Sequence, residues 1–283
     1  MNKEICSVYG LYHYKDGTPF VGPILKRMLQ IAVKTYPQRI KKSVDQITKD
    51  CDTNEIVRCL KILTGEEDEE DWIDVETGSK LIREWMKEEK LSEVMNMCLK
   101  PLQPVSDLLS SYDIHSVLQR YTCVENFGFK WLGVYTSSVG DMERLCSKFK
   151  ETFPKYQYIG AVLNTGTVTG SHWVSVLVES DEDKTTLEYY DPFGSEPTQV
   201  IAKNLKEMLK MMIGVYDQKV FSRTSVARHQ KGATHCGSYV LWYLVSRISG
   251  KNMGDLTGKQ MKDKDVKKWR ERLFRRRKRK LFQ

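Results

Sequence analysis

An apolar segment, residues 236–249, constrains the fold of this chain more than any other feature. It contains the longest uninterrupted apolar run, the seven residues Tyr239–Val245. Such a segment predicts a helix that is buried on all sides. Seven residues are far fewer than the ~20 that cross a bilayer, and the first six residues lack the apolar core and cleavage site of a signal peptide. We therefore expect a soluble protein that is not exported and has no membrane partner.

Two prolines, Pro101 and Pro104, mark a change in character along the chain. With 283 residues, the chain has room for about two domains of ~150 residues each. Before the prolines, the spacing of apolar residues predicts helices alone. The predicted features are a helix with residues 24–32, a capping box at Ser43 and Gln46, a helix with residues 56–63 that Gly65 ends, and helices over 79–90 and 92–99. We therefore expect a helical N-terminal domain at residues 1–105.

After residue 106, predicted strands alternate with predicted helices. The predicted strands are residues 156–163, 172–179, 185–190 and 219–228, and the predicted helices run from Asp113 to Tyr121, from Ser138 to Pro154, after Pro197, over 236–249 and over 259–274. Within residues 172–179, valines alternate with Ser175 and Glu179, which is the pattern of a half-buried strand. This order of elements predicts an α+β domain over residues 106–274.

One of the seven cysteines has the surroundings of a nucleophile. The odd number and the lack of a Cys-x-x-Cys pair argue against a zinc site and a secreted disulfide framework, so we expect free thiols, no metal and no cofactor. Most buried cysteines are simply small apolar residues. Cys236 differs because it follows a turn-prone segment, residues 232–235, and begins the predicted apolar helix. A helix N-terminus, a neighbouring imidazole and partial exposure all favour a thiolate.

The partners of such a cysteine can be sought among the five histidines. His172 opens a predicted strand, and Asp191 ends the next one. If the two strands pair, the carboxylate meets the imidazole and can hold its tautomer. The alternatives are a structural histidine and an ordinary turn aspartate before proline. Gln230, six residues before Cys236, can donate its amide to an oxyanion together with the Cys236 backbone N–H.

The order and spacing of His172-Trp173, Asp191 and Gln230-x5-Cys236-Gly237 resemble the catalytic signature of the adenain and ubiquitin-like-protein protease clan. Within this clan, the chain is most similar to the polyprotein proteases of African swine fever virus and related large DNA viruses. The similar stretches are 118–121, 162–165 through 170–173, 228–231 with 234–237, and 268–275, within residues 113–275. One departure is that the swine fever enzyme has asparagine where Asp191 stands, although aspartate is usual in the clan.

The resemblance implies a papain-like α+β fold, adenain- and SUMO-protease-like, whose nucleophile helix packs on a small antiparallel sheet. It implies a cysteine protease domain at residues 106–274, with Cys236 as nucleophile, His172 as its base and acid, Asp191 as the residue that orients His172, and Gln230 in the oxyanion hole. It also implies that Trp173 walls a narrow tunnel for glycines. A plain core tryptophan is an equally good interpretation of Trp173.

The resemblance further implies cleavage after small residues, often Gly-Gly. In the viral branch, the substrates are structural polyproteins, which would place the protein in virions and the host cytoplasm, at the viral factory, with the nucleus as another location. In the cellular branch, the substrates are SUMO-like conjugates, so a deconjugating protease is the alternative function.

A basic tail at residues 275–283 suggests a function of a different class. Residues 259–280 hold 13 Lys or Arg against three acids, so the net charge of +8 is concentrated there. The six basic residues Arg275–Lys280 lie between two phenylalanines, Phe274 and Phe282. Such a segment can bind a phosphate backbone and stack on bases. We expect an accessory role, DNA attachment or a nuclear address, with a nucleic-acid-binding protein as the alternative.

Overall fold

The protein is described here by a computed structural model that covers residues 22–35, 53–64, 84, 85, 87, 101, 103–122, 128–166, 172–215, 219–258 and 261–274. The chain forms two compact units, Met1–Lys100 and Pro101–Gln283. The finer boundaries at 105/106 and 274/275 stay predictions. None of the helices within the described ranges is long and apolar enough to span a bilayer.

The first unit contains two packed helices, α1 (Gly22–Thr35) and α3 (Thr53–Thr64). Their apolar stripes are buried, as the spacing predicts: Leu25, Met28, Leu29 and Ala32 on α1, and Ile56, Leu60 and Leu63 on α3. Trp85 is also buried, and its indole N–H donates to the Met28 carbonyl at 3.0 Å. The predicted capping box at Ser43, the helix over 92–99 and most of the helix over 79–90 lie outside the described residues.

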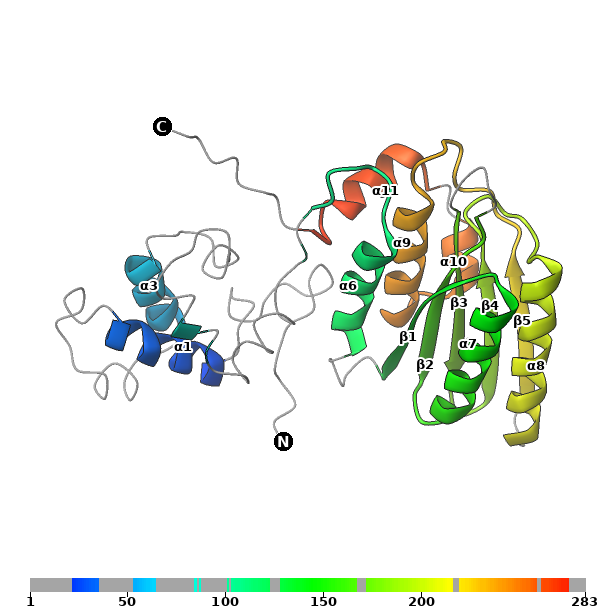
Figure 1. Cartoon of the computed structure of the whole chain (residues 1–283), viewed down its shortest axis with the longest axis horizontal. Coiled ribbons are helices and arrows are strands. Elements are labelled where there is room, and N and C mark those ends of the chain that lie inside the picture. Colours follow the sequence, from blue (N-terminus) through cyan, green and yellow to red (C-terminus); the bar gives the residue numbers. More distant parts are fainter. Residues whose placement is uncertain are drawn as a thin grey trace. The chain divides into compact units, whose positions relative to one another are not determined.

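The second unit is a sheet between two layers of helices (Figure 1). The strands are β1 (Phe129–Thr136), β2 (Tyr158–Asn164), β3 (Trp173–Ser180), β4 (Lys184–Tyr190) and β5 (Lys219–Ser225), in that spatial order. The central pairs β2–β3 and β3–β4 are antiparallel, while the outer pairs β1–β2 and β4–β5 are parallel. The expectation of an antiparallel sheet is therefore wrong at both edges, where a helix crosses over between neighbouring strands.

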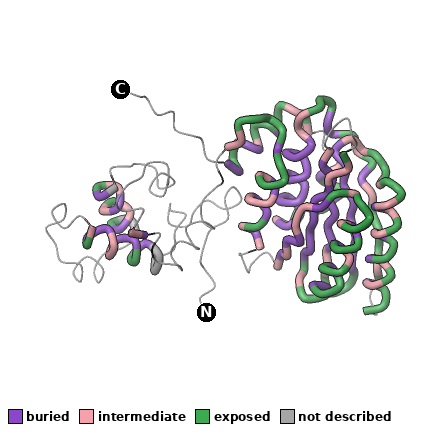
Figure 2. Tube along the Cα trace, viewed as in Figure 1, coloured by how far each residue is buried: buried purple, intermediate pink, exposed green. Residues whose placement is uncertain are grey.

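Those two crossover helices, α7 (Val139–Thr152) and α8 (Gln199–Val215), cover one face of the sheet. The other face is covered by α6 (Ser111–Thr122) and α9 (Cys236–Ile248), and α10 (Met253–Gly258) and α11 (Asp263–Arg270) pack on α9. All residues of α9 are buried, as the sequence predicts. Figure 2 shows the burial of α9 and the strands, against the exposed outer sides of α7 and α8.

Two predicted helix starts have different outcomes. Ser138 caps α7 as expected, because its side chain accepts from the Asp141 backbone N–H. Asp113 does not cap α6, which begins at Ser111. Instead, Ser110 Oγ accepts from the Asp113 N–H, and the Asp113 carboxylate accepts from the Ser110 N–H at 2.8 Å. This reciprocal arrangement is a capping box that starts three residues earlier than predicted.

Three other expectations need correction. Strand β1 is absent from the prediction because a register shift between Trp131 and Gly133 interrupts its alternation. Strand β3 is not half-buried: Ser175 is fully buried, because α9 covers the face that the polar residues suggested was exposed. The last predicted helix, 259–274, is α11 alone, and α10 was not foreseen.

Candidate active site

Cys236 is the first residue of α9, as the sequence predicts. The unpaired backbone N–H groups of a helix start and the helix dipole favour negative charge on such a sulfur. The expected partial exposure is not observed, since only 2% of Cys236 is exposed. The thiol therefore sits in a site that excludes most water.

The residue after it, Gly237, has a steric reason to be glycine. A Cβ at this position would lie 2.8 Å from the Cβ of Leu109. The carbonyl of Leu109 in turn accepts the indole N–H of Trp173 at 2.9 Å. Leu109 therefore holds the start of α9 beside the start of β3. Trp173 is buried, and its predicted role in substrate binding stays a prediction.

His172 and Asp191 meet as expected, because β3 and β4 pair in antiparallel register, with Ser175 opposite Tyr190. His172 Nε2 lies 2.8 Å from Asp191 Oδ1. The side chain of His172 is 21% exposed and that of Asp191 only 5%. With Nε2 bonded to the carboxylate, the other ring nitrogen, Nδ1, is available to the thiol of Cys236.

The electrostatics of His172 favour its charged form. Burial alone would lower the pKa of His172, but hydrogen bonds to Asp191 and Cys236, together with their charges, raise this pKa to about 9. The ring is therefore protonated at neutral pH. An imidazolium next to a cysteine stabilises a thiolate, so the pair is arranged as a nucleophile and a proton donor.

Phe193 belongs to the site, although the sequence argument did not select it. Its backbone N–H donates to Asp191 Oδ1 at 2.8 Å, and its ring stacks on His172 with 4.8 Å between centroids. The turn from Asp191 closes through the Gly194 N–H. Gly194 has φ +72°, and a Cβ there would lie 2.6 Å from the carbonyl oxygen of Val226. The sequence Asp-Pro-Phe-Gly predicts this turn, but it does not predict that the Phe193 ring lies on His172.

Gln230 is fully buried in the loop that leads to Cys236. The backbone N–H groups of His229 and Gln230 both donate to the Pro192 carbonyl, at 3.0 and 2.9 Å. The Gln230 side-chain amide donates to the Gly232 carbonyl at 2.6 Å. Because an amide NH₂ has two protons, one remains for another acceptor. The hydrogen bonds to Pro192 therefore hold the loop before Cys236 directly beside Asp191.

Three other candidates of the described ranges, His229, His115 and Cys146, have surroundings that do not suggest catalysis. His229 is buried in an aromatic cluster with Tyr190, Tyr239 and Trp242, and His115 Nδ1 accepts the Trp131 indole N–H at 3.1 Å. Burial raises the pKa of the Cys146 thiol. Among the residues that the structure describes, no group of three or more His, Cys, Asp or Glu could hold a metal ion.

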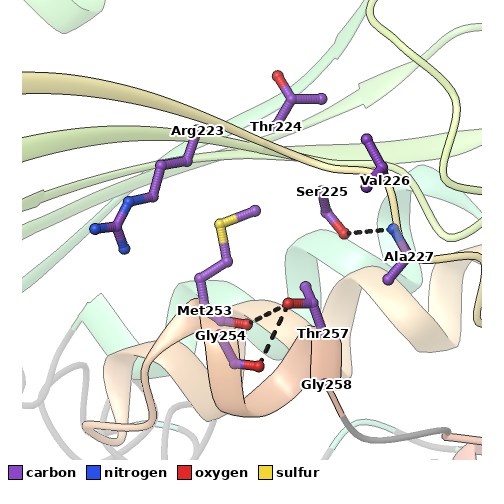
Figure 3. A pocket seen from close by; sticks show the side chains of 9 residues that line it. All are labelled: Arg223, Thr224, Ser225, Val226, Ala227, Met253, Gly254, Thr257 and Gly258. Atoms are coloured by element: carbon purple, nitrogen blue, oxygen red, sulfur yellow. Dashed lines mark hydrogen bonds between the residues drawn. The ribbon is translucent and has the colours of Figure 1, made fainter.

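A pocket of about 500 Å³ opens between the end of β5 and α10 (Figure 3). It is lined by residues 223–227 together with Met253, Gly254, Thr257 and Gly258. None of the candidate catalytic residues lines it, so this pocket is separate from the site at the start of α9.

The chain is similar to known cysteine proteases in sequence and in fold. Residues 91–282 match the family described as the Ulp1 protease family, C-terminal catalytic domain. Two relatives from African swine fever virus, a SUMO-1 cysteine protease and a cysteine protease, are each 28% identical over 194 residues, covering 59% of this chain and 68% of the relative. A crystal structure of a protease of the same virus is similar in fold, with a TM-score of 0.65 and 19% identity, covering 96% of this chain and 98% of that one.

Proposed function

This chain belongs to the Ulp1 protease family of cysteine proteases, and from that premise we propose that Cys236, His172 and Asp191 are its catalytic triad. The observation that supports this most is the hydrogen bond between Asp191 and His172, with Cys236, at the start of a buried helix, near enough to help raise the pKa of His172. Gln230 and the Cys236 backbone N–H complete the arrangement as donors to an oxyanion.

The mechanism follows from the position of each group. The Cys236 thiolate attacks the carbonyl carbon of the scissile bond, and the resulting oxyanion accepts hydrogen bonds from the Gln230 amide and the Cys236 N–H. The His172 imidazolium then gives its proton to the leaving amine. Loss of the amine leaves the acyl group on Cys236 as a thioester. His172 next takes a proton from the water that attacks this thioester, and the Cys236 thiolate leaves as the acid product forms. Asp191 holds Nε2 throughout, so that Nδ1 faces the sulfur.

For the substrate, we propose cleavage after small residues of the Gly-Gly type in a viral structural polyprotein. The likeness to African swine fever virus proteases supports a viral role in virions and the host cytoplasm, with the nucleus as another location. The deconjugation of SUMO-like proteins is the second candidate, favoured by the name of the family and of one relative. DNA binding by Arg275–Lys280 rests on the sequence alone, since this tail lies outside the described residues.

One experiment separates the two substrates. The protein and a Cys236→Ala control are incubated with Gly-Gly-x peptides, polyprotein fragments and SUMO fusions. We expect cleavage after Gly-Gly in peptides and fragments, and none by the control. Preference for SUMO fusions over all peptides would favour the second candidate.

The nucleophile is identified by labelling at near-neutral pH. Iodoacetamide or a vinyl sulfone should modify Cys236 first, because its neighbour His172 is held in the imidazolium form. Preferential labelling of Cys146 or Cys123 would contradict the assignment.

A further inference from the structure

Helix α11 begins with a carboxylate whose two oxygens both bind the loop before Cys236. Asp263 Oδ2 accepts the Gly232 N–H at 2.7 Å, and Oδ1 accepts the Lys231 N–H at 3.3 Å. Oδ1 also accepts the Tyr239 hydroxyl at 2.9 Å. Since Tyr239 is buried one turn after Cys236 in α9, Asp263 connects this loop to the helix that carries the nucleophile.

The contact between Asp263 and Gly232 fixes the carbonyl group that binds the side chain of Gln230. The carbonyl of Gly232 accepts the Gln230 amide, and its N–H donates to Asp263, so both backbone polar groups of Gly232 are fixed. The space is tight, because a Cβ on Gly232 would lie 3.2 Å from Asp263 Oδ2. At the other end of the loop, the Gln230 N–H is held by Pro192. The direction of the free amide proton of Gln230 therefore depends on Asp263.

Asp263 is charged when it makes these bonds. Burial would raise the pKa of its carboxyl, but the Gly232 N–H, the Tyr239 hydroxyl, the Lys231 N–H and the nearby His235 together lower it. Hydrogen bonds to an ionised carboxylate are roughly twice as strong as neutral ones. The loop is thus held more firmly than backbone contacts alone would hold it.

We propose that Asp263 is a positioning residue for the reaction, which aims the amide of Gln230 at the oxyanion through Gly232. This rests on the proposed roles of Cys236 and Gln230. Asp263 does not touch the reacting atoms. It acts on the transition state, where the oxyanion exists, and not on formation of the thiolate.

Asp263→Ala tests this with three measurements on the full chain. We expect kcat on a Gly-Gly peptide substrate to fall about 10- to 100-fold while KM stays within about twofold, because the substrate contacts remain. Inhibition by a Gly-Gly peptide aldehyde should weaken by a similar factor, since the aldehyde forms a tetrahedral adduct with an oxyanion. The rate of alkylation by iodoacetamide and its pH profile should not change, since neither involves an oxyanion.

Asp265→Ala is the matched control. It removes the same charge from the same helix turn, at an exposed position, and should behave as wild type in all three measurements. Asp263→Asn keeps one oxygen acceptor and should lose only about fivefold in aldehyde affinity. If Asp263→Ala does not fold, the same measurements on Asp263→Asn test the proposal.

The proposal is overturned if folded Asp263→Asn, or Asp263→Ala, binds the aldehyde as wild type does, or if alkylation slows as much as peptide cleavage. Failure of the proposed function has a different signature. In that case, wild type itself would not bind the aldehyde through Cys236.

Discussion

The two faces of the sheet in the second unit differ in chemistry. The face under α7 and α8 forms an apolar and aromatic core, with Val174, Val176 and Val178 of β3 against Leu145 of α7 and Leu205 of α8. The face under α9 contains buried charged and polar groups among its apolar residues, such as Ser175 and Glu188 beside Leu177. Both faces belong to the same strands, so residues next to one another in the sequence take part in different kinds of packing.

An ion cluster is the main polar feature of the α9 face. Arg247 binds Glu188 through Nε and Nη2 at 2.8 and 2.9 Å, and Glu179 through Nη2 at 2.5 Å. The Tyr243 hydroxyl also donates to Glu188, at 2.7 Å. Burial would lower the pKa of Arg247, but the two glutamates outweigh this and raise it, so the guanidinium stays charged.

The difference suggests separate roles for the two faces. Apolar packing tolerates substitution if volume is kept, whereas hydrogen bonds between charged groups require one alignment. The ion cluster joins α9, which begins with Cys236, to β3 and β4, which position His172 and Asp191. We therefore expect the apolar face to supply stability, and the polar face to supply stability together with the alignment of the site.

The largest effect is expected at the end of the sheet where α9 begins. His172→Ala removes the partner of the thiolate and the acid for the leaving amine, and should lower the cleavage rate by about 10⁴-fold or more. Asp191→Asn should retain measurable activity, because a Cys–His pair relies less on a charged third member. Cleavage of one peptide by both variants decides this. An Asp191→Asn protein that is folded and as inactive as His172→Ala would contradict it.

The pH dependence of the same reaction tests the charge of Asp191. The leaving amine needs the imidazolium form of His172, whose pKa is raised to about 9, so the wild-type rate should fall as the pH rises through about 9. In Asp191→Asn, the charge that raises this pKa is lost, and the fall should begin about one to three pH units lower. An unchanged high-pH limb would mean that Asp191 acts in another way.

Arg247→Met tests the ion cluster. It leaves Glu188, which is fully buried, without its opposite charge, and should lower the free energy of unfolding by about 3–5 kcal/mol. Urea denaturation measures this. Lys210→Met is the control, because it removes an exposed ion pair with Glu207, for which we expect less than ~1 kcal/mol. The double variant Arg247→Met/Glu188→Gln should recover part of the loss; no recovery would show that charge is not the cause.

Leu145→Ala tests the apolar face. The side chain is fully buried on α7, and its loss should lower the free energy of unfolding by about 2–4 kcal/mol. Because it contacts no group of the site, kcat of the folded protein should stay within about twofold of wild type. A fall in kcat like that expected for Asp263→Ala would remove the distinction between the two faces.

The sequence by itself determined those features whose signals lie within a few residues. The apolar run predicts the buried helix α9, and Ser138 predicts the start of α7. The short link between β3 and β4 lets the pattern predict an antiparallel pair that brings His172 to Asp191. These conclusions depend on local periodicity, on caps and on one hairpin, which act over short separations.

The tertiary structure alone decided which distant residues support the site. Trp173 meets Leu109 across 64 residues, Arg247 meets Glu188 across 59, and Gly232 meets Asp263 across 31. It also decided that Ser175 of β3 is buried, since α9 covers that face of the sheet, and that Glu179 binds Arg247 of α9. No local sequence pattern predicts such contacts, because each forms only after the sheet and both helix layers have packed. Whether a side chain is buried depends on a partner that is distant in the sequence.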